Sequence, residues 1–536
     1  MDTQTDRKRP RRPMRRAFIG NFLDDGYRPK RKLKTNADVA RYLLQASLAD
    51  WGGKPVTGPN PASDARIART MAMEVIAAVE REGGKVAANW YTEAIGRAVK
   101  VASAMHPELA DDAKAIEIGK GIASAEDARC VFFAALAITS QNVTIHENVR
   151  YALEQYRHYV KEGSFLPKGY GTKGSSIEGN LRRFNFMVEA FEGVAGVRDF
   201  LAREFRMGDL AKVAEGVGIK LALREGLNEM VYGSMVFGPK IGNGFYQNLI
   251  GNHRPVTIDM WFMRTFGRYT GTLVKDIVTP AQVDRLVNAL RSRDGDMIAK
   301  MVENDVAVSH EDIVAMEATD LGELVQAMML CWERMRRELQ AGGMSNPDIS
   351  AYKSRIGWPG AADSIVKSLV APVDQPERRS DRKWIRSVVG KAQDLLAKDG
   401  YHVSAADIQA LLWYPEKDLY DFLSSRPLGY LNVSYDEALI VLARQEGFTD
   451  DRIEAAIGTL GRGAGGPGVH PGAGPGEPAA VQVVREGAGG PAAPGEGQAS
   501  GRSPSGRAGF LSRRPRRVLA VATEDSEDAP LPGGFR

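Results

Sequence analysis

The sequence predicts an all-α protein with two lobes and long tails. Apolar residues recur at spacings of three and four in many segments, for example residues 39–51 and 67–82, as expected for amphipathic helices. Alternating β-branched runs typical of strands are hard to find anywhere in the chain. With 536 residues, of which 43% are hydrophobic, the chain is long enough for two or three packed domains in addition to its tails.

Residues 1–34 are predicted to form a disordered basic arm. They contain twelve Lys or Arg and four Asp, a charge of +8, whereas the whole chain carries +4, so the rest carries −4. Pro10 and Pro13 interrupt the arm, which has too few apolar residues to pack a core. Such an arm adds salt-sensitive affinity for nucleic acid of any sequence. A solubility tail or an address read by a receptor is the alternative.

Two helical regions are expected to follow, an N-terminal one over residues 35–120 and a larger one over residues 121–345. The larger region begins with the strongly apolar residues 125–138. A helix over residues 220–236 is expected to lead into a glycine turn. Helices over residues 283–290 and 324–339 are expected to close this region.

The remainder divides into a small helical module over residues 380–460 and a tail over residues 461–536. Gly, Pro and Ala dominate the tail without periodicity, so it is predicted to be disordered. Within the module, Trp413, Tyr414 and Pro415 form either a patch that binds a protein partner or the core of the module itself.

The most informative segment runs from Gly238 to Arg268. Gly238, Pro239 and Gly242 forbid a continuous helix, and a tight glycine turn that opens a helix exposes backbone N–H groups able to bind phosphate. A short loop and the sequence VTID follow, and Asp259 is expected to cap a helix that starts at Met260. A phosphate grip and a single acid therefore follow one another about twenty residues apart.

This order resembles the helix-hairpin-helix DNA glycosylases of base excision repair. In that superfamily a hairpin of the type LPGVG precedes a helix, and a VD(T/V)H-like segment carries an essential aspartate. Residues 239–242 match the hairpin, and residues 256–259 match the segment that ends in the aspartate. A second match at residues 137–142 is similar to a segment that reaches toward DNA from an early helix. The resemblance covers roughly residues 121–345.

The resemblance implies a set of site residues. Asp259 would be the catalytic carboxylate, while Trp261 and Tyr246 would belong to the base pocket. Trp261 would stack on a flipped base or fill the core, and Arg264 and Arg268 would contact phosphate or be solvated surface charges. The residues expected to contact DNA are Gly238, Lys240, Gly242, Asn243, Gly244, Gln141, Asn142, Arg264 and Arg268.

The resemblance also implies which chemistry to expect. Relatives that cut the strand carry a lysine where this chain has Gly244, and Lys240 inside the hairpin is better placed for a phosphate than for C1′. A lyase step through a Schiff base is therefore not expected. Asp259, kept ionised by the helix start, would stabilise an oxocarbenium-like sugar or orient water. No cofactor or metal is expected, because Cys130 and Cys331 are too few for the iron–sulfur cluster of some relatives.

The sequence thus predicts a monofunctional base-excision glycosylase that binds double-stranded DNA. The alternative is a non-catalytic DNA-binding protein, structural or packaged, of a phage or mobile element, because residues 403–420 are similar to short segments of such proteins. No stretch of the sequence reaches the apolar length of a membrane span. We expect a protein of the bacterial cytoplasm or of a virion. The recognised base and the oligomeric state are not predicted.

Overall fold

A computed structural model describes residues 16–23, 29, 33–81, 90–274, 318–356, 358, 360, 371–424 and 433–459. Residues 1–15, the predicted helix over residues 283–290 and the tail beyond residue 459 lie outside the described part. The predicted disordered arm over residues 1–34 is wrong for residues 16–23, which include a short helix and bury Ala17, Ile19 and Phe22. In the described part, the prediction of an all-α protein is confirmed. Its single sheet pairs two short antiparallel strands, β1 (Glu204–Arg206) and β2 (Met230–Tyr232). No described helix is long and apolar enough to cross a membrane.

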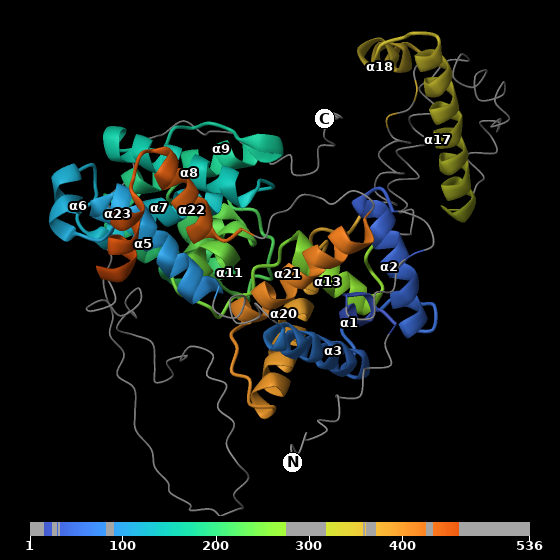
Figure 1. Cartoon of the computed structure of the whole chain (residues 1–536), viewed down its shortest axis with the longest axis horizontal. Helices are drawn as coiled ribbons and strands as arrows, with labels where there is room; N and C mark the ends of the chain where they lie inside the picture. The colour runs from blue at the N-terminus through green and yellow to red at the C-terminus, as the bar shows by residue number, and fades with distance from the viewer. Residues whose placement is uncertain are drawn as a thin grey trace, which may run out of the picture.

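Most elements gather around one large hydrophobic core, which we call the first lobe (Figure 1). Its centre is α7, which packs against α8, α9 and α10. Short 3₁₀ and π segments carry the label η. Besides β1 and β2, the elements of the first lobe are η1 (Trp90–Ala94), α5 (Ile95–Met105), η2 (Pro107–Leu109), α6 (Asp112–Ile118), α7 (Ala125–Thr139), α8 (Ile145–Glu162), η3 (Gly171–Lys173), α9 (Gly174–Ala190), α10 (Val194–Ala202), α11 (Met207–Gly216), η4 (Gly233–Phe237), η5 (Ile241–Tyr246), α12 (Gln247–Leu249), α22 (Tyr435–Gln445) and α23 (Asp450–Thr459).

A second lobe forms around two further clusters of buried residues. The helix α13 lies at its centre and packs against α2, α3 and α21, while α20 lies along α3 (Figure 1). The helices of the second lobe are α1 (Ile19–Leu23), α2 (Asn36–Asp50), α3 (Pro61–Glu80), α13 (Met260–Thr270), α20 (Arg379–Lys398) and α21 (Ala405–Leu423).

Several of these helices begin at caps that the sequence encodes. Thr144 accepts a hydrogen bond from the Glu147 N–H, and the Glu147 carboxylate accepts one from the Thr144 N–H in return. Ser404 with Asp407 at the start of α21, and Ser434 at the start of α22, form the same reciprocal arrangement. Each cap satisfies backbone donors that the first helical turn leaves unpaired, so it fixes where the helix begins.

The chain passes between the lobes three times. It begins in the second lobe, enters the first between residues 81 and 90, returns at residues 250–256, and enters the first lobe again between residues 424 and 433. Each lobe is therefore assembled from segments that are far apart in the sequence. The candidate functional site lies at the junction of the two lobes.

The predicted domain boundaries are not those of the structure. The expected module over residues 380–460 does not stand alone, because α20 packs along α3, while α22 and α23 pack against α5. The expected N-terminal region over residues 35–120 is likewise divided between the lobes. Local sequence patterns do not reveal these boundaries, because helices that complete one core are separated by hundreds of residues.

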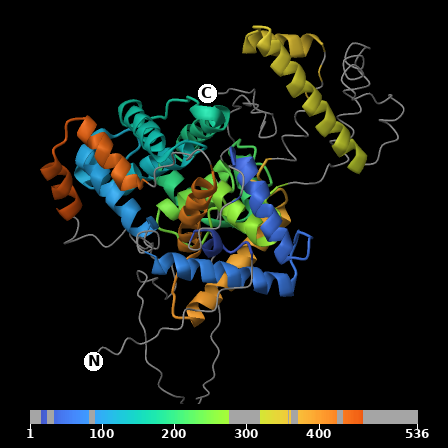
Figure 2. The ribbon, with the colours of Figure 1, turned by 45° about the vertical axis from the view of Figure 1, so that its right-hand side comes forward.

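Two smaller expectations are also wrong. Residues 220–229 are not helical, and Glu225 is buried there in ion pairs with Arg382 and Arg386 of α20, the latter at 2.8 Å. The expected closing helix over residues 324–339 belongs to α17 (Ala318–Ala341), which packs against α18 (Asn346–Arg355). Figures 1 and 2 show this pair standing apart from both lobes.

The second lobe is held by a buried ion network around Arg268. Its guanidinium donates to Glu74 of α3 at 2.7 and 2.8 Å and to Glu416 of α21 at 2.7 and 3.0 Å. A further N–H donates to the Ala17 carbonyl at 2.8 Å, and Glu74 accepts from the Ile19 N–H at 2.8 Å. The Arg268 side chain has no exposed surface, so four segments of the lobe depend on one cation.

We expect Arg268→Met to destabilise the protein by about 3–5 kcal/mol, because two buried carboxylates would lose their counter-charge. Urea unfolding followed by circular dichroism measures this change. Arg254→Met is the matched control, since Arg254 is exposed and only 4.0 Å from Glu204, and its effect should stay within about 0.5 kcal/mol. Equal stabilities of the two variants would contradict the importance given to the network.

Candidate functional site

Asp259 lies where the chain has just returned to the second lobe. Its carboxylate accepts a hydrogen bond from the Phe262 N–H at 2.8 Å, so the predicted cap of a helix starting at Met260 is confirmed. Residues 256–258 form no strand, but Val256, Thr257 and Ile258 are buried. Anchoring on both sides thus fixes the position of the carboxylate.

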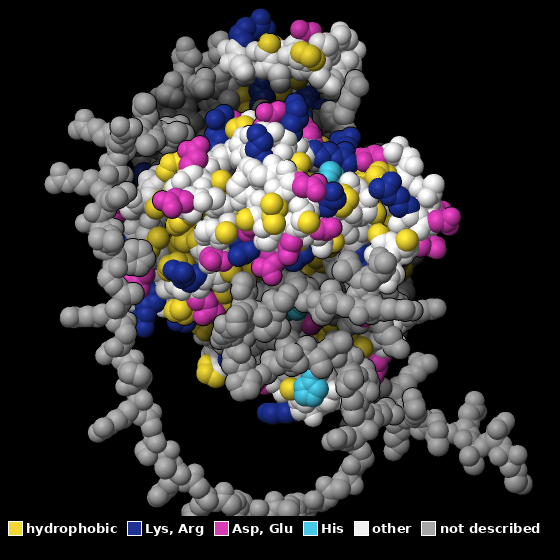
Figure 3. All heavy atoms as spheres, turned by 90° about the vertical axis from the view of Figure 1, so that its left-hand side faces the viewer, with side chains coloured by type: hydrophobic (Ala, Val, Ile, Leu, Met, Phe, Trp, Pro, Cys, Tyr) yellow, Lys and Arg dark blue, Asp and Glu magenta, His cyan; other side chains and the backbone are white. Residues whose placement is uncertain are grey.

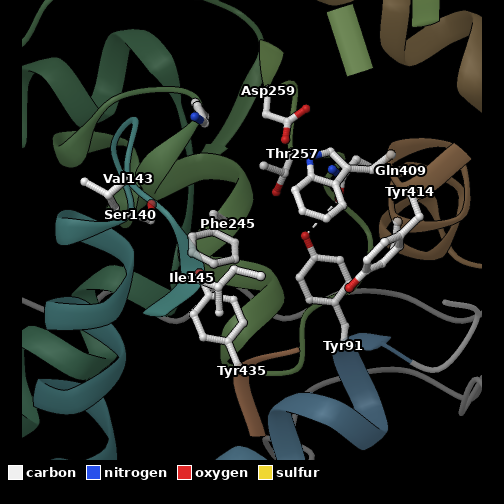
Figure 4. Close-up of a pocket in the computed structure, with 13 residues that line it drawn as sticks. Tyr91, Ser140, Val143, Ile145, Phe245, Thr257, Asp259, Gln409, Tyr414 and Tyr435 are labelled. Carbon is white, nitrogen blue, oxygen red and sulfur yellow. Dashed lines mark hydrogen bonds between the residues drawn. The ribbon is translucent and has the colours of Figure 1, made fainter. Parts of the chain in front are cut away.

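A cavity of about 120 Å³ opens beside Asp259, at the junction of the two lobes. At roughly 30 Å³ per water, this volume has room for about four water molecules, which suits a single planar ring system. Figure 4 shows the rings of Phe245, Tyr91, Tyr414 and Tyr435 around this space, with Asp259 at one end. The lining residues are Tyr91, Ser140, Val143, Ile145, Lys240, Phe245, Thr257, Asp259, Gln409, Ala410, Trp413, Tyr414 and Tyr435.

Polar groups in the cavity wall are held in place by hydrogen bonds. The Tyr91 hydroxyl donates to Gln409 Oε1 at 3.0 Å, which joins η1 to α21 (Figure 4). Thr257 donates to Asn248 Oδ1 at 2.7 Å, and the Asn248 amide donates to the carbonyls of Asn252 and Pro255. Burial raises the pKa of Tyr91 well above its usual range, so its hydroxyl stays protonated.

The environment of Asp259 favours its neutral form more than the sequence suggests. Burial raises the pKa of this carboxyl above its usual value, although the charge of Lys240, the Phe262 N–H and the Trp413 indole N–H all act to lower it. The expectation that the helix start keeps the group ionised therefore accounts for only one of the opposing effects. The accessible part of the side chain faces the cavity, where a bound cation or developing positive charge would favour ionisation.

A cleft of about 820 Å³ adjoins the cavity and shares Asp259 and Lys240 with it. Many residues that the sequence assigned to DNA contact line this cleft together. They are Gln141, Asn142, Gly238, Lys240 and Asn243. The structure thus brings the 137–142 segment, the hairpin and the carboxylate to one place, although about a hundred residues separate the first segment from the other two.

Close packing of the hairpin against its neighbours requires glycine at two of its positions. A Cβ on Gly242 would lie 1.6 Å from the Ser234 carbonyl oxygen, so only glycine allows η5 to pack this closely on η4. A Cβ on Gly244 would lie 3.0 Å from the Thr257 Cα. Neither glycine lines the cleft, so the structure does not support the predicted DNA contacts of Gly242 and Gly244, and a side chain at position 244 would crowd Thr257.

The predicted DNA contacts of Arg264 and Arg268 are wrong. Arg268 is wholly buried in the ion network described above. Arg264 is 4% exposed, pairs with Asp374 at 3.0 Å, and its guanidinium lies 4.5 Å from the centre of the Trp261 ring. Both cations are already neutralised inside the second lobe, so neither is available to a phosphate.

The predicted base-pocket roles of Trp261 and Tyr246 also fail. Tyr246 is 1% exposed and contacts Cys130 Sγ at 3.4 Å inside the first lobe, away from the cavity. Trp261 borders the cleft but is 3% exposed and packs edge-on against Tyr420. Of the two alternatives for Trp261, the structure therefore supports core packing.

The sequence assigned none of the aromatic residues that line the cavity to a base pocket. Trp413 and Tyr414 were expected to form a partner patch or a module core, yet both face the cavity. Tyr91 and Tyr435 carry no local signal, because each reaches the cavity from a segment that follows a passage between the lobes. The adjacent Trp413 and Tyr414 were the only hint in the sequence.

Charge around the cleft is mixed. Lys173 and Arg224 lie on its rim, whereas Arg382 and Arg386 face Glu225. On the far side of the first lobe, Figure 3 shows Lys and Arg side chains interspersed with Asp and Glu among the described atoms. In the described part of the chain, no three His, Cys, Asp or Glu side chains are grouped as they would be around a metal ion.

No protein-family model matches the chain, and searches of curated proteins and of solved structures also found no match.

We expect Asp259→Asn to stabilise the protein by about 1 kcal/mol at pH 8, because asparagine keeps the helix cap and removes a partly buried charge. Since burial raises the pKa of Asp259, the gain should vanish on acidification, as the native carboxyl becomes protonated too. Thermal unfolding between pH 4 and pH 8 measures both effects.

Asp127→Asn is the control for this prediction. Asp127 is also buried, but it pairs with Arg198 at 2.7 Å, so neutralising it should destabilise the protein. A loss of stability in Asp259→Asn comparable with that in Asp127→Asn would refute the view that the ionised Asp259 carboxylate destabilises the native protein.

Proposed function

We propose that the protein is a monofunctional DNA glycosylase that hydrolyses the bond between a base and its deoxyribose. The observation that carries this proposal is the cavity between the lobes, which has aromatic walls and Asp259 at one end. Binding to the DNA backbone alone does not require an aromatic pocket beside a carboxylate. The all-α, two-lobed architecture is compatible with a helix-hairpin-helix core.

The residues suggest how the reaction would proceed. A nucleotide flipped from the duplex would insert its base into the aromatic cavity, with the sugar near Asp259. The C1′–N bond would break with both electrons leaving on the base, and positive charge would develop on the sugar. The Asp259 carboxylate would stabilise that charge and accept a proton from the water that adds to C1′, and this proton would then pass, directly or through solvent, to the departed base.

The cleft supports the same proposal. Gly238, Lys240 and Asn243 line it on the hairpin side, and Gln141 and Asn142 line it opposite. Backbone N–H groups of such a turn, together with the Lys240 ammonium, suit the phosphates that flank an extruded nucleotide. The cavity and the cleft share Asp259, so a base in one and a backbone in the other would belong to the same strand.

Duplex oligonucleotides that carry uracil, 8-oxoguanine, alkylated purines or thymine mismatches test the proposal directly. We expect the protein to leave abasic sites on at least one substrate, revealed as strand breaks only after alkali, and Asp259→Asn to lower the rate by at least about a hundredfold. Breaks without alkali would contradict the monofunctional assignment.

The same assay separates the alternative function. If no substrate yields abasic sites, while the protein and Asp259→Asn bind DNA with equal, salt-sensitive affinity, the glycosylase proposal fails. That result would instead support the non-catalytic DNA-binding role in a phage or mobile element. Circular dichroism of both proteins shows that any loss is not due to unfolding.

The pH profile of the reaction provides a separate prediction. The rate should rise with pH as Asp259 ionises, and Lys240→Gln should move this limb to higher pH, because the lysine charge lowers the pKa of the carboxyl. Lys173→Gln is the control, since Lys173 lies on the cleft rim and is not among the groups that shift Asp259. An unmoved limb in Lys240→Gln, or an equal shift in both variants, would count against the role of Lys240.

A further inference from the structure

We propose that Tyr91 and Gln409 select the base that enters the cavity, and that they favour a base with a carbonyl oxygen on its hydrogen-bonding edge. This inference rests on the proposed function, because it names the class of base that the same pocket accepts. Guanine-like and thymine-like bases belong to this class. Adenine does not.

Gln409 is a polar group that faces the cavity with part of its hydrogen-bonding capacity unused. It is 5% exposed and lies on α21, between the two lobes. Its Oε1 accepts the Tyr91 hydroxyl, while the structure shows no hydrogen bond from its amide nitrogen to any described residue. Because Gln409 lines the cavity, its amide nitrogen can donate to a molecule bound there.

Tyr91 fixes which way the amide points. The phenol is 4% exposed and comes from η1, a different segment from the helix that carries Gln409. Because burial keeps this hydroxyl protonated, it remains a donor and holds the amide oxygen toward itself. The two N–H donors of Gln409 are then the groups left for a ligand.

Two donors discriminate among bases by the pattern of each edge. A free glutamine amide pairs with adenine by using its oxygen and its nitrogen together. With the oxygen engaged by Tyr91, the 6-amino group of adenine would face another donor. Guanine presents the acceptors O6 and N7 side by side, and thymine presents O4, so these edges match the Gln409 donors.

The remaining walls cannot make this distinction. Phe245, Tyr414 and Tyr435 offer aromatic faces, and stacking tolerates every base because each has a π-face. The Thr257 hydroxyl donates to Asn248 at 2.7 Å and also interacts with Tyr91. The Ser140 hydroxyl donates to the Ala137 carbonyl, and Lys240 and Asp259 have the proposed roles at the phosphate and the sugar. Tyr91 and Gln409 are therefore the pair left to read the base edge.

The test is equilibrium binding by the full chain carrying Asp259→Asn, which prevents turnover. Fluorescence anisotropy compares duplexes in which a single dG or a single dA stands unpaired opposite an abasic analogue. The two purines have nearly the same size, so stacking contributes nearly equally to both. We expect dG to bind about tenfold more tightly, the size of one or two well-made hydrogen bonds.

Four added substitutions identify the source of the preference. Gln409→Leu should remove it by weakening dG, and Gln409→Glu should remove it by replacing the donors with acceptors. Tyr91→Phe should reduce it mainly by strengthening dA, because the amide oxygen is released. Gln141→Leu is the control, since Gln141 lies in the cleft and is bonded to Ser176 and the Ile138 carbonyl, so the preference should survive.

Equal affinity for dG and dA, a preference that persists in Gln409→Leu, or no measurable binding of either duplex would overturn the inference. A preference that depends on Gln409 in a protein that leaves no abasic sites would refute the glycosylase proposal and keep the inference about base selection. Abasic sites formed on guanine-like and adenine-like substrates alike, with unchanged rates in Gln409→Leu, would support the glycosylase proposal and refute the inference about base selection.

Discussion

The second lobe depends on the burial of the Arg268 guanidinium between Glu74 and Glu416. The guanidinium donates five hydrogen bonds to three segments, so its desolvation is compensated only when α3, α13 and α21 meet. The same contacts position the candidate site. Asp259 stands at the start of α13, nine residues before Arg268, and Gln409 precedes Glu416 on α21 by seven residues, about two turns. The network and the cavity therefore share α13 and α21, so the contacts that hold these helices together also position Asp259 and Gln409.

The candidate site is a product of the way the chain passes between its lobes. Tyr91 follows the first passage, Thr257 and Asp259 follow the second, and Tyr435 follows the third. These residues lie at the junction between the two cores and line the cavity there. The cavity is what remains when both cores are filled. This arrangement resembles a general preference of ligand pockets for the interfaces between domains.

Opposing effects act on the ionisation of the Asp259 carboxyl. The helix start, Lys240 and the Trp413 N–H favour its charged form, whereas burial favours its neutral form more strongly. A carboxylate held in this balance is poorly solvated before a ligand binds, and a positive charge that develops beside it gains more than it would in water.

Local pattern was sufficient for the helical character and for the cap at Asp259, whereas the grouping of Gln141, Asn142, Lys240 and Asn243 near that acid was implied by the resemblance to a known superfamily. Periodicity, glycine turns and caps act over a few residues, so the sequence by itself determines them. It did not determine that Arg264 and Arg268 are buried, that Tyr246 points into the first lobe, or that Tyr91, Gln409 and Tyr435 meet. Those facts were decided by tertiary structure, because burial and pairing depend on partners such as Glu74 and Glu416, which lie 194 and 148 residues away from Arg268.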